Sequence, residues 1–493
     1  MSLPIIIQGG MGVAISDWRL AQAVSQQGQL GVVSGTGLNR VLVSRLMDGD
    51  LTGHMRRAMR HFPFSAPIQN LLGRYYIPNG KAPHEPYKTP PAYSLRPPRL
   101  LDQLTAIANF AEVWLAKENH TGLVGLNLLE KIQLPSLASL YGAMLAGVDF
   151  VLMGAGIPTQ VAGILDKLAR HEPVTYRLNV IGAEKDDDYR ISFDPEQIFP
   201  GISQIMGQLK RPRFLPIISS VVLAQALLKR SEGRVDGFVI EGSTAGGHNA
   251  PPRGEMKLNH KGEPIYGEKD EVNLEKIKQL GLPFWLAGGY GHPSQLQHAL
   301  EAGATGIQVG TAFSLCDESA LESGLKKKLL RKVIDGQAQV HTSPVVSPTG
   351  FPFKVAQLEG TMSEQEVYEA RPRVCDFGGL RNLYKRADGR VGYRCPAEPV
   401  DDYVRKGGQL EETVGRTCLC NNLAATAGFP QRRKNGYVEQ PLVTSGDDLV
   451  NIRQFLSLGK TSYTAKDVIN YLLNHCSYRG LLNLLEPARD STV

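Results

Sequence analysis

One short stretch combines residue types that can do chemistry: an acid, two adjacent glycines and a histidine, at Glu241, Gly246, Gly247 and His248. The glycines have no Cβ, so the backbone there can lie close to a flat or anionic ligand. The histidine can carry or release a proton near neutral pH. The stretch follows an apolar run, 237–240, with the composition of a buried strand. The alternative is a tight turn with a polar tip, because such strings are also frequent in turns.

Two further glycine-rich segments follow apolar runs later in the chain. Loops after the seventh and eighth strands of a barrel commonly bind phosphate through backbone N–H groups. A phosphate needs several convergent donors and little side-chain bulk, and glycines meet both needs. The alternative is that these glycines only let the chain turn. The residues predicted to bind the phosphate group are Ala287, Gly288, Gly289, Gly291, Gln308, Gly310 and Thr311.

Amide, carboxylate and thioether side chains stand at other predicted strand ends. Amides offer the donors and acceptors that suit a flavin or a similar heteroaromatic ring. Together with the phosphate site they predict a phosphorylated planar cofactor, although each residue alone is also explained as ordinary strand-end polarity. The residues predicted to contact the cofactor here are Gln8, Gly9, Gly10, Met11, Asn127, Glu241, Gly246 and Gly247.

The elements that would position these groups are short apolar runs that alternate mostly with helical patterns. Near-continuous apolar strands separated by helices predict a parallel sheet covered by helices. Eight such strands predict an α/β fold, a closed (β/α)8 TIM barrel with its site at the carboxyl ends of the strands. An open, doubly wound sheet is the alternative. The predicted strands are 4–8, 30–34, 124–128, 150–153, 214–219, 237–240, 283–287 and 306–311.

Two insertions and a C-terminal domain extend the predicted barrel. The first insertion begins with a basic helical stretch over about 40–60 and continues into a Pro- and Tyr-rich segment. The second contains a predicted β-hairpin. The expected division is a barrel domain over 1–320, with insertions at about 40–120 and 174–213, and a smaller α-rich, cysteine-containing accessory domain over 321–493.

Five segments, taken together and in order, form a recognisable set: Pro4–Met11, Gly125–Asn127, Ala245–His248, Leu286–Gly289 and Gln308–Thr311. They make residues 4–315 similar to the nitronate monooxygenase (2-nitropropane dioxygenase-like) family of FMN-dependent barrels. That family is in turn related to the FMN-dependent enoyl-acyl carrier protein reductases. The resemblance implies that FMN lies on the strand ends and that the catalytic histidine of the family corresponds to His248.

The resemblance implies an FMN-dependent oxidoreductase, and the first expectation is a nitronate monooxygenase that oxidises alkyl nitronates with O2. There the histidine serves as a base or orients the anionic nitronate. The alternative is an NAD(P)H-dependent enoyl-thioester reductase of fatty-acid or polyketide type, with an acyl carrier protein as a possible partner. Glu241 stands where the monooxygenases often have Gln and the reductases Glu. A third alternative is a non-catalytic flavin- or metal-binding interaction protein.

The composition argues against several other classes. The 493 residues are 42% hydrophobic and 21% charged with a net charge of +6, which is ordinary for a soluble globular protein. The basic clusters lack interleaved aromatic residues, so nucleic-acid binding is not expected. No apolar run reaches the roughly 18 residues of a membrane span, and no secretory signal is visible. We therefore expect a cytoplasmic protein that does not bind membranes.

Four cysteines near the C-terminus form a second candidate group: Cys375, Cys395, Cys418 and Cys420. Four thiols can ligate zinc or an iron–sulfur cluster, but their spacing differs from a pair of C-x-x-C knuckles. Reduced, partly buried thiols are therefore the favoured interpretation, and no metal is expected. Arginines and tyrosines nearby are candidates for docking an anionic group such as a carrier-protein phosphopantetheine: Arg381, Arg394, Arg405, Tyr384, Tyr393 and Tyr403.

Overall fold

The computed structural model describes residues 3–456 and 459–478 of the chain. Its central sheet has eight strands: β1 (Ile6–Gln8), β2 (Gly31–Ser34), β3 (Val124–Leu129), β4 (Phe150–Gly154), β8 (Arg213–Ile218), β9 (Phe238–Glu241), β11 (Phe284–Ala287) and β12 (Gly306–Val309). All neighbours pair in parallel, in the order β1-β12-β11-β9-β8-β4-β3-β2. The sheet closes where Ile7 bridges Leu30. The predicted (β/α)8 barrel is therefore confirmed, and the open sheet is wrong.

The interior of the barrel is filled by apolar side chains. Phe150, Leu152, Leu215 and Val239 are buried there together with the ring of Trp285. The indole Nε1 of Trp285 donates a hydrogen bond of 2.8 Å to the carbonyl of Pro4, near the start of the first strand. Because side chains occupy the interior, a ligand can reach only the carboxyl ends of the strands.

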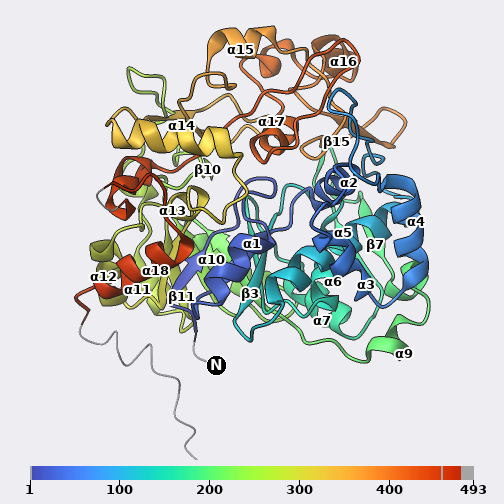
Figure 1. Ribbon diagram of the computed structural model, residues 1–493, viewed down its shortest axis with the longest axis horizontal. Coiled ribbons are helices and arrows are strands. Elements are labelled where there is room, and N and C mark those ends of the chain that lie inside the picture. The colour runs from blue at the N-terminus through green and yellow to red at the C-terminus, as the bar shows by residue number, and fades with distance from the viewer. Residues whose placement is uncertain (1–2, 457–458, 479–493) are drawn as a thin grey trace, which may run out of the picture.

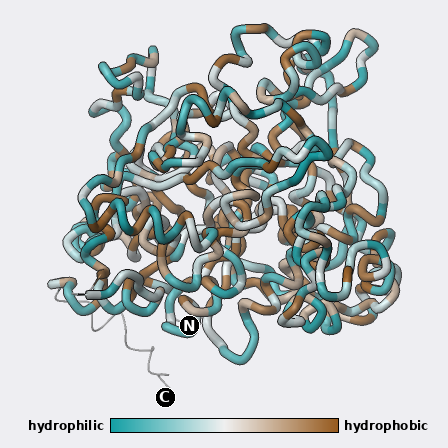
Figure 2. Tube along the Cα trace, turned by 45° about the horizontal axis from the view of Figure 1, so that its top comes forward, coloured by the Kyte–Doolittle hydropathy of each residue, from teal (hydrophilic) through white to brown (hydrophobic). Residues whose placement is uncertain are grey.

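Seven helices surround the sheet: α1 (Trp18–Ser25), α5 (Arg99–Lys117), α6 (Ser136–Leu145), α7 (Val161–Ala169), α10 (Val221–Arg230), α11 (Leu274–Lys278) and α12 (Pro293–Glu301). The carboxylate of Asp17 caps α1 by accepting from the backbone N–H of Arg19 at 2.9 Å. Figure 1 shows how the helices cover the strands, and Figure 2 shows apolar residues concentrated inside the molecule.

The first insertion differs from its prediction. It contains α2 (Leu38–Met47), α3 (His54–Arg60) and α4 (Ser65–Tyr75), so the single helix expected over about 40–60 is wrong. The chain breaks between α2 and α3 because Gly49, Asp50 and Gly53 adopt positive φ angles of 91°, 39° and 71°. Helix α5, which the sequence assigned to the insertion, packs between α1 and α6. It therefore serves as the barrel helix that connects β2 to β3.

The second insertion contains the expected hairpin. Strands β5 (Val174–Arg177) and β7 (Arg190–Phe193) pair antiparallel. Between them, β6 (Val180–Ile181) leaves the hairpin and pairs in parallel with β15 (Asn382–Lys385), which belongs to the C-terminal part of the chain. Two short helices follow, α8 (Pro195–Ile198) and α9 (Ile202–Met206).

The remaining elements continue the barrel and form the C-terminal part: β10 (Gly247–His248), the 3-10 helix η1 (Glu268–Asp270), α13 (Thr311–Ser314), α14 (Ser323–Ile334), β13 (Val340–Ser343), β14 (Phe353–Ala356), α15 (Gln365–Ala370), β16 (Val391–Arg394), α16 (Val400–Arg405), the 3-10 helix η2 (Leu410–Thr413), α17 (Leu419–Thr426), the 3-10 helix η3 (Asp447–Phe455) and α18 (Ala465–Asn474). Strand β14 lies between β10 and β13 in a three-stranded antiparallel sheet. The C-terminal part is thus joined to a barrel loop by backbone pairing.

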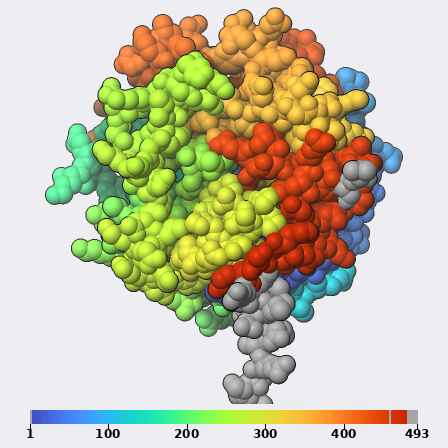
Figure 3. Space-filling model, turned by 90° about the vertical axis from the view of Figure 1, so that its left-hand side faces the viewer, coloured from blue at the N-terminus to red at the C-terminus, as the bar shows by residue number. Residues whose placement is uncertain are grey.

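The last described elements return to the barrel. Helix α18 packs on α1 and α12, and η3 packs on α13 and α14. In Figure 3 this red segment lies next to the yellow part of the surface. One apolar core includes barrel residues and residues such as Leu449 and Val468, so a domain boundary at 320 stays a prediction. Among the described residues no helix is long and apolar enough to cross a bilayer.

Candidate active site

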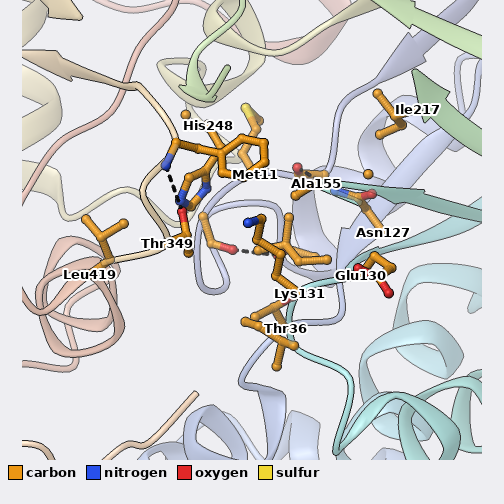
Figure 4. Close-up of a pocket in the computed structure, with 18 of the residues that line it drawn as sticks. Met11, Thr36, Asn127, Glu130, Lys131, Ala155, Ile217, His248, Thr349 and Leu419 are labelled. Carbon is orange, nitrogen blue, oxygen red and sulfur yellow. Dashed lines mark hydrogen bonds between the residues drawn. The ribbon is translucent and has the colours of Figure 1, made fainter. Parts of the chain in front are cut away.

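A cavity of about 1190 Å³ opens at the carboxyl ends of the barrel strands. Its wall also includes Tyr93 of the first insertion and Phe377 and Leu419 of the C-terminal part. Figure 4 shows side chains from barrel strand ends, such as Asn127, and from the C-terminal part, such as Thr349 and Leu419, around one space. The sequence-predicted residues that line the cavity are Gly9, Gly10, Met11, Asn127, Glu241, Gly246, Gly247, His248, Ala287, Gly288, Gly289, Gln308, Gly310 and Thr311.

Two predicted cofactor contacts do not line the cavity. Gln8 is fully buried, and its carboxamide accepts from the N–H of Val32 at 2.9 Å and donates to the hydroxyl of Ser16 at 3.0 Å. Its side chain therefore joins β1 to β2 instead of facing a ligand. The N–H of Gly291 donates to the carboxylate of Asp448 at 3.0 Å. These two assignments are corrected to structural roles.

Several polar atoms at the floor of the cavity have no partner among the described residues. The Asn127 side chain donates to the carbonyl of Gly10 at 3.1 Å, but its Oδ1 accepts nothing. The Oε1 atom of Gln308 is also buried without a partner. Burial raises the pKa of Glu241 to about 7. Buried polar atoms without partners are rare in proteins, so this arrangement is typical of a site that receives a ligand.

The glycine turns at β11 and β12 present free backbone donors. Gly288 and Gly289 adopt positive φ angles of 88° and 75°, which a side chain would disfavour. Within the described residues, the N–H groups of Gly289 and Gly310 make no hydrogen bond to a backbone acceptor. Convergent N–H groups of this kind suit an anion such as phosphate.

A segment of the C-terminal part crosses this glycine-rich side of the cavity. The N–H of Gly446 donates to the hydroxyl of Thr311 at 3.0 Å, and the N–H of Asp447 donates to the carbonyl of Thr244 at 3.0 Å. A Cβ atom added to Gly446 would lie only 2.9 Å from the carbonyl oxygen of Thr244. The approach of the two backbones therefore requires glycine at this position.

His248 is positioned by the C-terminal part of the chain. It belongs to β10, a two-residue strand that the sequence predicted as a loop, and it pairs with Phe353 of β14. Its Nε2 lies 2.7 Å from the hydroxyl of Ser347. Burial, with a smaller contribution from the charge of Lys131, lowers the pKa of His248 to about 4. The imidazole is therefore neutral at physiological pH.

Sequence reasoning missed several residues of the cavity wall. Glu130 and Lys131 follow directly after β3 and lie beside Asn127 in the cavity (Figure 4). Burial raises the pKa of Glu130 and lowers that of Lys131, whose Nζ lies 3.6 Å from the centre of the Phe351 ring. The rule that catalytic groups follow barrel strands would have found this pair. No local signal identified Thr349 or Leu419, because both come from distant segments.

The other predicted groups lie in the C-terminal part, and two of their members, Arg381 and Cys420, line the cavity. All six cysteines are free thiols, and the described residues hold no cluster of three or more His, Cys, Asp or Glu side chains arranged to bind a metal ion. Arg381 stacks on Tyr393 and Arg394 on Tyr384, with 4.8 Å and 4.7 Å to the ring centres. Arg381 also donates to the carbonyl of Tyr93 at 2.7 Å. These arginines are therefore engaged within the fold.

Residues 210–345 match the family model described as Nitronate monooxygenase. A Mycobacterium tuberculosis protein named (3aS,4S,5R,7aS)-5-hydroxy-7a-methyl-1-oxo-octahydro-1H-indene-4-carboxyl-CoA dehydrogenase is 26% identical over 48% of this chain and 58% of its own length. A nitronate monooxygenase from Paraburkholderia phytofirmans is 26% identical over 39% and 50%. One from Pseudomonas aeruginosa is 30% identical over 27% and 35%. The chain thus covers less than two thirds of each relative's length.

The chain is also similar to two solved structures. FabK from Thermotoga maritima has a TM-score of 0.46 at 14% identity, covering 96% of this chain and 93% of its own. A nitroalkane oxidase from Streptomyces ansochromogenes has a TM-score of 0.44 at 14% identity, covering 98% of both chains. The sequence matches confirm the resemblance that was inferred from the glycine-rich strand ends.

Proposed function

We propose that this chain, a relative of the nitronate monooxygenases, is an FMN-dependent oxidoreductase with its flavin at the carboxyl ends of the barrel strands. The observation that carries the proposal is a set of polar groups around one cavity: the carboxamide oxygens of Asn127 and Gln308, which have no partner among the described residues, and the carboxyl of Glu241, whose pKa is raised by burial. A flavin ring carries N–H donors and carbonyl acceptors that complement them. FMN bound there would supply electron or hydride transfer.

The chemistry of the residues fits this cofactor. With a pKa of about 7, Glu241 is partly protonated at neutral pH and can donate as well as accept a hydrogen bond. The N–H groups of Gly289 and Gly310, which have no backbone acceptor among the described residues, offer donors for the phosphate of FMN. No side chain would obstruct the phosphate at these glycines. The predicted cofactor contacts other than Gln8 and Gly291 are therefore kept in the proposal.

The substrate that the cavity favours is an acyl thioester, and we infer that the reaction is NAD(P)H-dependent reduction of an enoyl thioester. The cavity of about 1190 Å³ exceeds the roughly 300–1,000 Å³ of most ligand pockets. It extends from the strand ends to Tyr93 of the first insertion and Leu419 of the C-terminal part. The M. tuberculosis relative is named for a CoA thioester. An acyl carrier protein or CoA would then carry the substrate.

Nitronate oxidation with O2 is the second candidate. The family match and the P. phytofirmans and P. aeruginosa relatives favour it. The ammonium group of Lys131 acts electrostatically on His248 inside the cavity, and such a cation would stabilise an anionic nitronate. In either reaction His248 would contact the substrate through the ring nitrogen that Ser347 leaves free.

Anaerobic reduction of the purified protein separates these candidates. We expect a yellow protein whose flavin absorbance is bleached by NADH or NADPH and restored by a trans-2-enoyl-CoA. Bleaching by ethyl nitronate, with none by NADH or NADPH, would favour the monooxygenase. Yellow protein that responds to neither reagent would favour the non-catalytic alternative. A colourless protein that takes up no FMN would rule out every flavin-dependent function proposed for the chain.

A further inference from the structure

One lysine lines the cavity, Lys131, and its ammonium group makes no ion pair in the part of the chain that the structure describes. Its Nζ also donates no hydrogen bond to a described residue. The arginines of the cavity wall differ, because each donates to a backbone carbonyl oxygen: Arg40, Arg177, Arg253 and Arg381. Lys131 is therefore the cation of this wall that is left for a ligand (Figure 4).

The position of Lys131 is fixed at both ends of the residue. Its backbone belongs to the turn after β3, where the N–H of Glu130 donates to the carbonyl of Gly154 at 2.9 Å. Its Nζ lies 3.6 Å from the centre of the Phe351 ring, in the loop between β13 and β14. The negative face of an aromatic ring attracts a cation. The ring thus holds the ammonium group without neutralising its charge.

The neighbouring acid does not neutralise this charge either. The Oε1 atom of Glu130 accepts from the side chains of Gln133 at 2.7 Å and Asn179 at 3.4 Å. Burial lowers the pKa of Lys131 and outweighs the attraction of Glu130, which acts in the opposite direction. The charged lysine is therefore disfavoured in this structure, and an anionic group in the cavity would stabilise it.

Lys131 and His248 lie on the same side of the cavity. The charge of Lys131 contributes to the lowered pKa of His248. The loop that provides Phe351 also provides Ser347, whose Oγ lies 2.7 Å from Nε2 of His248. The imidazole proposed to contact the substrate is thus neutral, and the charged group beside it is an ammonium.

We propose that Lys131 binds the substrate oxygen that carries or develops negative charge. The assignment rests on the proposed function, in which this oxygen is the thioester carbonyl, where negative charge develops as the conjugated double bond is reduced. In a nitronate the oxygens of the same planar group are already charged. An ammonium group stabilises either oxyanion, and the neutral imidazole of His248 adds no charge of its own.

Binding of two unreactive probes to oxidised, FMN-loaded protein tests the assignment without turnover. Acetoacetyl-CoA is a thioester that loses a proton to form an enolate, and the ultraviolet absorbance of the enolate reports how much is bound in that form. Propionate resembles ethyl nitronate in size and charge. Calorimetry measures the Kd of each probe. We expect acetoacetyl-CoA to bind as the enolate at a pH at which the free thioester is mostly un-ionised.

Variants of Lys131 show whether its charge is responsible. Lys131→Met should weaken enolate binding roughly ten- to a hundredfold, the usual effect of losing a hydrogen bond to a charged group. Lys131→Arg should retain most of it, because it keeps the charge. The matched control is Lys81→Met, since Lys81 also lies over a ring, 4.4 Å from the centre of Tyr87, but does not line the cavity. Unchanged binding of both probes in Lys131→Met would overturn the inference.

Two further outcomes would also overturn it. One is a wild-type protein that takes up FMN and binds neither probe. The other is a Lys131→Met variant that binds the probes normally but holds FMN less tightly or with a lower reduction potential, because the ammonium group would then act on the cofactor.

The two probes also separate this inference from the proposed reaction. Lys131-dependent binding of propionate alone would keep the role of Lys131 and assign it to a nitronate. Lys131-dependent binding in a protein that neither NADH nor NADPH reduces would reject the reductase and keep the inference. Full reductase activity and unchanged probe binding in Lys131→Met would do the reverse.

Discussion

His248 and Phe353 face each other across the short antiparallel pair β10–β14, and their rings meet edge to face with centroids 4.8 Å apart. The candidate catalytic residue is on a barrel loop, while its packing partner is on the C-terminal part. Aromatic contacts of this geometry stabilise by about 0.5–1.5 kcal/mol beyond the burial of area. The orientation of the imidazole therefore depends on a contact between two distant segments of the chain.

Phe353→Leu should let the His248 imidazole sample more orientations while the protein stays folded. Phe353 is buried, and replacing it by a smaller apolar side chain should lower the free energy of unfolding by about 1–2 kcal/mol. We expect kcat to fall several-fold because His248 samples more orientations. Thermal unfolding and steady-state kinetics measure the two effects.

Phe284→Leu is the matched control, because Phe284 is equally buried in β11 and should lower stability with little change in kcat. Equal kcat losses in both variants would argue against a specific contact.

His248→Ala should separate cofactor binding from turnover. The cofactor contacts proposed above do not include the imidazole, so FMN content should match that of the wild type. Loss of the proposed contact between the imidazole and the substrate should reduce kcat by about 10²–10³-fold. Because the pKa of His248 is lowered to about 4, wild-type kcat/KM should show no histidine titration between pH 5 and 8. An acid limb near the ordinary histidine pKa that disappears in His248→Gln would show that the imidazole is more accessible to water than this structure indicates.

Glu241→Gln should remove a pH dependence of stability from the protein without cofactor. Burial raises the pKa of Glu241 to about 7 in the folded state, whereas the unfolded carboxyl titrates at its usual value. The folded protein therefore binds the extra proton between these values, and wild-type stability falls as pH rises toward 7. The difference between variant and wild type should grow by up to about 3 kcal/mol from pH 4 to pH 8. Urea unfolding at both pH values measures it, and a constant difference would contradict the assigned pKa.

The barrel could be predicted from the sequence because each strand is a short apolar run that ends in glycine or a polar residue. The same pattern located Asn127, Glu241 and Gln308, since residues that follow parallel strands share one edge of the sheet. Gln8 follows this pattern as well, but its carboxamide oxygen accepts a hydrogen bond from the backbone N–H of Val32. A prediction from strand ends has no information on which polar side chains already form hydrogen bonds within the fold.

The part of the site that comes from the C-terminal segments could not be predicted. Ser347 and Phe353 are about a hundred positions from His248, and no periodicity or motif marks them. The pairing of β14 with β10 joins only two residues of a glycine-rich stretch that has the composition of a loop. Such contacts depend on the packing of whole elements and not on local propensity.

Asp448→Asn should strengthen FMN binding if the phosphate lies at the glycine turns. The Asp448 carboxylate lines the cavity and accepts from the N–H of Gly291 at 3.0 Å. A carboxamide oxygen can accept the same hydrogen bond without the negative charge. Burial raises the pKa of Asp448, the direction expected for a carboxyl whose ionised form is disfavoured at this position. Removing one partly solvated like charge is worth about 0.2–1 kcal/mol, or roughly a 1.4- to fivefold lower Kd for FMN at pH 8. Riboflavin, which lacks the phosphate, is the control ligand. Its Kd should not change, and equal changes for both ligands would show that the phosphate lies away from Gly288 and Gly289.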